Sequence, residues 1–151
     1  GTMADIFDYI VGNQITTVPL AGAPMAIRSA SVLAGSVQLV AIEPYSSGMP
    51  TVTLQPMNPM ATGTAGPPVV VAASDPQLAF DGTHVGLLEI TTGFHLLAPD
   101  GTPADAPIPL QVVNYAYGAE AIAGLPGNGF AIVWIEQQST IWKLRAAHVM
   151  P

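Results

Sequence analysis

The sequence contains no cysteine and very few basic residues. Without cysteine the chain can form neither disulfide bridges nor thiolate metal sites. Three Lys and Arg residues stand against ten Asp and Glu residues, which gives a net charge of −7. Proteins that bind nucleic acid or anionic lipid neutralise phosphates with clustered basic side chains. Three cations in 151 residues cannot supply such a cluster, so we expect no nucleic acid and no membrane as a partner.

Charge of either sign is scarce. Charged residues make up only 9% of the chain, whereas hydrophobic residues make up 50%. Soluble domains typically carry about 25% charged residues. A surface with so few charges tends to expose apolar patches, and large apolar patches mark contacts with other molecules. We therefore expect a homo-oligomer.

Long apolar runs are also absent. Fifteen Gly and fifteen Pro residues are spread along the chain and divide its apolar segments. Both residues disfavour helix interiors, and no apolar run approaches the about 20 residues of a membrane-spanning helix. The remaining short segments are rich in β-branched and aromatic residues, which favour strands. The sequence thus predicts one all-β domain over residues 1–151.

Three apolar segments that each end in a glutamate recur at nearly constant spacing. They are residues 36–43 (SVQLVAIE), 83–89 (THVGLLE) and 129–136 (GFAIVWIE). The steps between Glu43, Glu89 and Glu136 are 46 and 47 residues. A period of this length is typical of repeat architectures, in which each repeat is one supersecondary unit.

The pattern within each repeat predicts, in order, a strand, a glycine turn, the apolar strand that ends in glutamate, and further strands. The second unit is the clearest, because Asp81-Gly82 is a strong hairpin signal between two apolar segments. We expect Ile108-Pro109-Leu110 to begin its last strand. Four antiparallel strands per unit correspond to one blade of a β-propeller. The predicted units are residues 26–71, 77–113 and 119–149.

The second unit carries two short turn motifs, and the third unit carries a strand motif. Phe80-Asp81-Gly82-Thr83 forms one turn, Asp100-Gly101-Thr102 forms a later one, and Trp134-Ile135-Glu136 ends a strand. With these motifs the chain resembles the repeats of secreted bacterial β-propellers over about residues 26–149. The resemblance implies an extracellular location, although Met3-Ala4-Asp5-Ile6 lacks the basic start of a signal peptide.

Three blades cannot close a ring, since propellers contain about four to eight blades. The third unit lacks a fourth strand, while residues 6–20 predict two strands that belong to no unit. Residues 15–20 could therefore complete the blade that begins at Ala119, either within one chain or between chains. Two chains of three blades would give a six-bladed homodimer. A β-trefoil, which closes three four-stranded repeats as a monomer, is the alternative fold.

Glu43, Glu89, Glu136 and Trp142 are the candidate ligand-binding residues. A glutamate repeated in every blade could line a ring of carboxylates for cations or sugar hydroxyls; alternatively, each glutamate accepts hydrogen bonds from turn amides. An exposed Trp142 could stack on a sugar, whereas a buried one would fill the space between blades. Trp134 is expected in the core between blades.

Residues for metal or catalytic chemistry do not form a known motif. His84, His95 and His148 lack the spacing of zinc ligands, although we expect the first two on neighbouring strands of one blade. No nucleophile elbow and no phosphate-binding loop is present, so we predict no cofactor. We expect a non-catalytic binding or scaffold module with a glycan or protein ligand. The alternative is a small hydrolase or lyase that uses an axial pocket of the assembled propeller.

Overall fold

The computed structural model confirms the all-β class. It describes residues 6–11, 14–19, 26–44, 51–60, 64–89, 93–110 and 115–151. No helix in these ranges is long and apolar enough to span a membrane.

The strands are short apolar segments that end at glycine, proline or polar turns. They are β1 (Ile6–Val11), β2 (Gln14–Pro19), β3 (Ala26–Ala34), β4 (Val37–Pro44), β5 (Val52–Met57), β6 (Val69–Val71), β7 (Gln77–Phe80), β8 (Val85–Glu89), β9 (Gly93–Leu97), β10 (Tyr115–Leu125), β11 (Gly129–Gln138) and β12 (Ile141–Val149). The hairpin turn between β3 and β4 contains Gly35, whose φ of 63° is a conformation that glycine adopts without strain.

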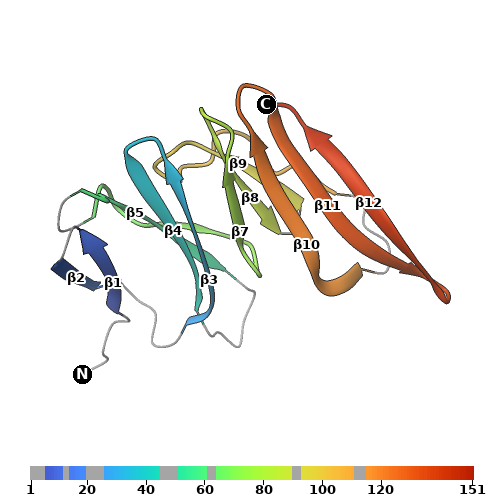
Figure 1. Ribbon diagram of the computed structural model, residues 1–151, viewed down its shortest axis with the longest axis horizontal. Coiled ribbons are helices and arrows are strands. Elements are labelled where there is room, and N and C mark those ends of the chain that lie inside the picture. The colour runs from blue at the N-terminus through green and yellow to red at the C-terminus, as the bar shows by residue number, and fades with distance from the viewer. Residues whose placement is uncertain are drawn as a thin grey trace.

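The strands form antiparallel sheets whose order follows the sequence (Figure 1). A two-stranded sheet, β1-β2, is followed by the first large sheet, β3-β4-β5-β6. The second large sheet is β7-β8-β9, and the third is β10-β11-β12. None of these sheets closes into a barrel. A β-trefoil requires a closed barrel. The three glutamate-ending segments become β4, β8 and β11, the second strand of each large sheet.

The predicted strand at Ile108 is reduced to an isolated bridge with Phe94. The backbone N–H groups of Phe94 and Ile108 donate to each other's carbonyl oxygens at 2.9 and 2.8 Å. Pro109 has no N–H group, so the ladder cannot continue beyond this pair. The second sheet therefore has three strands with a bridged segment along β9, where the sequence predicted a fourth strand.

β1 and β2 pair with each other rather than with β12. Residues 15–19 consequently do not complete the third sheet within one chain, and position 20 of the predicted strand lies outside the described residues. The third sheet ends at β12, whose described pairing is with β11 alone.

The large sheets stack face to face with apolar side chains between them. The core between the first and second sheets includes Leu39 and Leu54 from one side and Leu87 and Leu97 from the other. A second core joins the second sheet to the third. Its buried members are Ala79, Leu88, Phe94, Phe130, Ile132, Trp134 and Val149. The prediction that Trp134 lies in a core between sheets is confirmed.

The first strands of the three large sheets lie side by side, because β3 and β10 each contact β7. Gly124 on β10 permits the closest approach: a Cβ atom there would meet the carbonyl oxygen of Phe80 at 1.9 Å. The N–H group of Gly127 donates to the carbonyl oxygen of Asp81 at 3.0 Å. The stack is therefore fixed at this end by backbone contacts as well as by its apolar cores.

Candidate functional site

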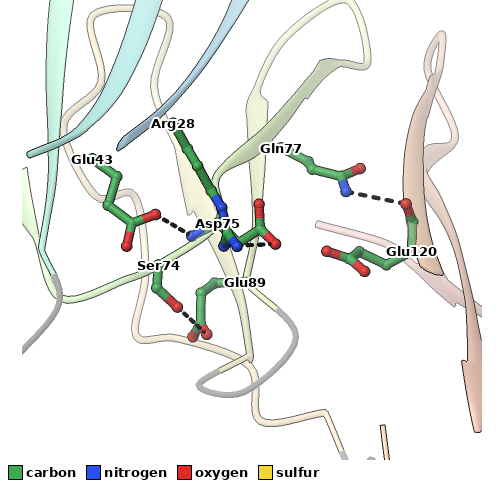
Figure 2. Close-up of polar contacts among 7 residues, drawn as sticks. All are labelled: Arg28, Glu43, Ser74, Asp75, Gln77, Glu89 and Glu120. Atoms are coloured by element: carbon green, nitrogen blue, oxygen red, sulfur yellow. Dashed lines mark hydrogen bonds and ion pairs between the residues drawn. The ribbon is translucent and has the colours of Figure 1, made fainter. Parts of the chain in front are cut away.

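Polar side chains converge where β4 and β8 end and β7 begins (Figure 2). Glu43 and Glu89 lie at the ends of β4 and β8, and both point toward Ser74 and Asp75, in the segment that connects the first sheet to the second. The backbone N–H group of Asp75 donates to Glu43 Oε2 at 2.7 Å. The hydroxyl of Ser74 donates to Glu89 Oε1 at 3.1 Å. Two of the predicted site residues thus hold the same connection between sheets.

The two glutamates approach this segment from opposite sides of one interface. Glu43 alternates along β4 with Leu39 and Ala41, and Glu89 alternates along β8 with Val85 and Leu87. All four apolar residues belong to the core between the first and second sheets. Glu43 is 8% exposed and Glu89 is 2% exposed, so neither presents a broad surface to solvent. Glu43 thus accepts a hydrogen bond from the backbone amide of Asp75, as in the alternative in which each glutamate binds turn amides.

Glu136 has different neighbours. It alternates along β11 with Ile132 and Trp134, which face the core between the second and third sheets. Its Oε1 accepts the indole N–H of Trp134 at 3.0 Å, and its Oε2 accepts from Arg145 Nε at 2.9 Å. The three glutamates are therefore not equivalent in the stack, even though they recur at almost constant spacing in the sequence.

Three further residues of the polar cluster come from the first strands of the three sheets. Arg28 on β3 forms an ion pair with Asp75 at 2.8 Å. Gln77 at the start of β7 donates from Nε2 to the backbone oxygen of Glu120 on β10 at 3.0 Å. Sequence reasoning missed Arg28, Gln77 and Glu120, because only the stacking of the sheets brings them together. The available signal was their place on the first strand of each unit.

Glu120 is the carboxyl group with a perturbed pKa in this cluster. Burial raises the pKa of Glu120 above its usual value, the charge of Asp75 raises it further, and Arg28 acts in the opposite direction. Its Oε2 atom is buried and has no hydrogen-bond partner. A carboxyl group in this state can retain a proton above the pH at which an exposed glutamate loses it.

Trp142 lies on the outward face of the third sheet. Its side chain is 59% exposed, so within one chain it does not fill a space between sheets. Because directly paired residues share a face, the register also assigns Val133, Leu144 and Ala146 to this surface. Val133 is 38% exposed and Leu144 is 75% exposed.

We call this surface the outward face. Its members, taken from the register of β10, β11 and β12, are Ala121, Ala123, Ala131, Val133, Ile135, Gln137, Trp142, Leu144, Ala146 and His148. None of them is Asp, Glu, Lys or Arg. The outward face is therefore an uncharged sheet surface, and among the residues that the structure describes no other sheet packs on it.

His84 and His95 lie close to neighbouring strands, as expected, but they are not directly paired. His84 precedes β8, with Nδ1 3.8 Å from Asp81 Oδ2, whereas His95 on β9 pairs with Leu87. Burial lowers the pKa of His95 below its usual value, against the opposing effect of the Glu89 carboxylate. Within the described ranges, no three His, Asp or Glu side chains are placed to hold a metal ion.

The cluster combines buried carboxylates, one arginine and amide donors at one end of the stacked strands. Such a set can bind hydroxyl groups, and Glu120 can donate or accept a proton. Comparison of the chain with protein-family models, with curated proteins and with solved structures found no match.

Proposed function

We propose that the protein is a non-catalytic binding or scaffold module, built as half of a β-propeller that two identical chains complete. Two features of the stack support a propeller. The large sheets pack face to face as adjacent blades do. Their first strands lie side by side, in the arrangement expected of the innermost strands around a channel.

The observation that carries this proposal is the uncharged outward face. In the first sheet the face that bears Leu39 is covered by the second sheet, and in the second sheet the face that bears Leu88 is covered by the third. The corresponding face of the third sheet, with Trp142 and Leu144, is exposed. A second copy would continue the stack across this face, and cyclic dimers are the commonest closed symmetry.

The proposed ligand is a glycan or another protein, bound at sites that assembly multiplies. Multivalent display strengthens weak individual sites without new contacts. A glycan array tests the glycan branch directly: we expect weak, calcium-independent binding that increases when the glycan is displayed in clusters. A folded sample that binds no glycan across a broad array would leave a protein ligand as the form of this proposal.

A small hydrolase or lyase is the second candidate, and the state of Glu120 favours it. A carboxyl group with raised pKa beside Asp75, on an innermost strand, has the properties of a general acid. The test is a screen against glycoside and ester substrates with the wild type and Glu120→Gln. Turnover that the substitution abolishes would support the enzyme, whereas turnover that persists unchanged would remove Glu120 from the reaction.

A further inference from the structure

A cavity of about 320 Å³ lies at the opposite end of the strands from the glutamate cluster. Its walls come from three segments: the β7–β8 turn, the β10–β11 turn and the residues after β12. The side chains that line it are those of Asp81, Thr83, His84, Asn128, Met150 and Pro151. The volume lies at the lower end of the range for small-molecule sites, about 300–1,000 Å³.

Hydrogen bonds hold the cavity walls in place. Asp81 Oδ1 accepts from the backbone N–H groups of Thr83 at 2.8 Å and His84 at 2.7 Å. Gly127 N–H donates to Asp81 O across the two sheets, and a His148 ring nitrogen contacts Asn128 O. A site whose walls are already ordered loses little entropy when it binds a ligand.

The lining selects against several ligand classes. No Lys or Arg lines the cavity, and the Asp81 carboxylate repels anions, so phosphates and carboxylates do not fit. The described histidine and carboxylate groups provide no three-ligand metal site. Thr83 and Asn128 can each both donate and accept hydrogen bonds, as sugar hydroxyls can. Met150 and Pro151 offer apolar contact to a C–H face.

We infer that this cavity binds one neutral saccharide residue. The inference rests on the proposed binding function and assigns its glycan branch to a position. Asp81 Oδ2 would accept a hydrogen bond from one ring hydroxyl, and the Asn128 side-chain amide would donate to another. The Thr83 hydroxyl would add a third hydrogen bond. Met150 and Pro151 would cover the apolar side of the ring.

The test is a titration of the full chain with methyl glycosides of glucose, galactose, mannose and N-acetylglucosamine, followed by amide chemical shifts. We expect at least one glycoside to shift the amides of Thr83, His84, Gly127 and Asn128. Thr83→Val and Asn128→Ala should each weaken that binding about fivefold, as the loss of one hydrogen bond does. Thr140→Val, in the exposed β11–β12 turn, is the matched control and should leave it unchanged.

Two results would overturn the inference. The first is a glycoside that shifts other amides, such as those around Trp142, with an affinity that Thr83→Val and Asn128→Ala do not change. The second is a response of the cavity amides to tetramethylammonium but to no glycoside. If a glycan array is positive in either case, the binding function stands and only its assignment to this cavity fails. An array without binding would instead remove the glycan branch of the proposed function itself.

Discussion

Replacing Trp134 by alanine tests whether the third sheet is held to the second by a packed core. Trp134 is 7% exposed and packs in the cluster that contains Phe94, Phe130 and Ile132. Its indole N–H also donates to Glu136 Oε1 at 3.0 Å, in a buried position. Truncation therefore opens a cavity and removes one partner of a buried carboxylate.

The cost should be large. Substitutions of core tryptophan or phenylalanine by alanine typically lower the free energy of unfolding by about 3–5 kcal/mol. With a urea m-value of about 2 kcal/mol/M, the unfolding midpoint should fall by about 1.5–2.5 M. Trp134→Phe keeps most of the ring but loses the donor, so it should cost less than Trp134→Ala and report on the bond to Glu136.

Trp142→Ala removes the same side chain from the outward face, where it is 59% exposed in the single chain, so it should cost less than Trp134→Ala and leave the core between the second and third sheets intact. Met60→Ala, at a residue that is 82% exposed and lies outside this face, is the neutral control and should change stability by no more than about 0.5 kcal/mol, as surface substitutions usually do. Urea melts followed by circular dichroism would compare the variants. Equal, small losses for Trp134→Ala and Trp142→Ala would refute the stacked arrangement of the second and third sheets.

Three further predictions concern close approach and pH. Gly124→Ala should lower the free energy of unfolding by about 1–3 kcal/mol, because the new Cβ atom would meet Phe80 O at 1.9 Å. The loss should appear as a lower melting temperature, and an unchanged melting temperature would contradict that contact. The folded-state pKa of Glu120 is raised, so its contribution to folding stability is favourable below the unfolded pKa and is lost as pH rises through the folded pKa. The Glu120→Gln variant should therefore be as stable as wild type in acid and more stable than wild type at neutral pH. The folded-state pKa of His95 is lowered, so its contribution to folding stability is present above the unfolded pKa and is lost as pH falls. His95→Gln should therefore lessen the loss of stability below neutral pH. An unaltered dependence of stability on pH would count against burial of this imidazole.

Local patterns were sufficient to predict most strands. The β11 segment combines a glycine turn with a run of apolar residues, and Asp81-Gly82 marks the turn before β8. These signals depend on neighbours in sequence, so they need no knowledge of packing. Ile108 shows the limit: its segment is apolar, but Pro109 prevents a ladder from continuing, and only one bridged pair remains.

The candidate site could be predicted only in part. Glu43 and Glu89 were found by repetition, but their meeting at Ser74 and Asp75 depends on which face of each sheet they occupy. A one-residue difference in spacing reverses that face, because side chains alternate along a strand. Arg28 and Glu120 lie 92 positions apart in the sequence and join one cluster only through the stack.

Substitutions on the outward face test the proposal that a second copy of the chain packs on it. Leu144 is 75% exposed in the single chain, and a second copy would bury it. Leu144→Glu should therefore disrupt the proposed dimer, because a buried carboxylate without a partner is costly. Met60→Glu places the same charge at an apolar residue that is 82% exposed and lies outside this face, so it should leave the dimer intact.

The mass of the wild-type protein in solution, measured by light scattering over a dilution series, tests the central claim most directly. If two chains complete one propeller, the mass should be about twice the chain mass of 15.5 kDa. The value should persist on dilution until the protein unfolds, because separation exposes the outward face. A folded monomer of about 15.5 kDa that remains stable at low concentration would contradict the account.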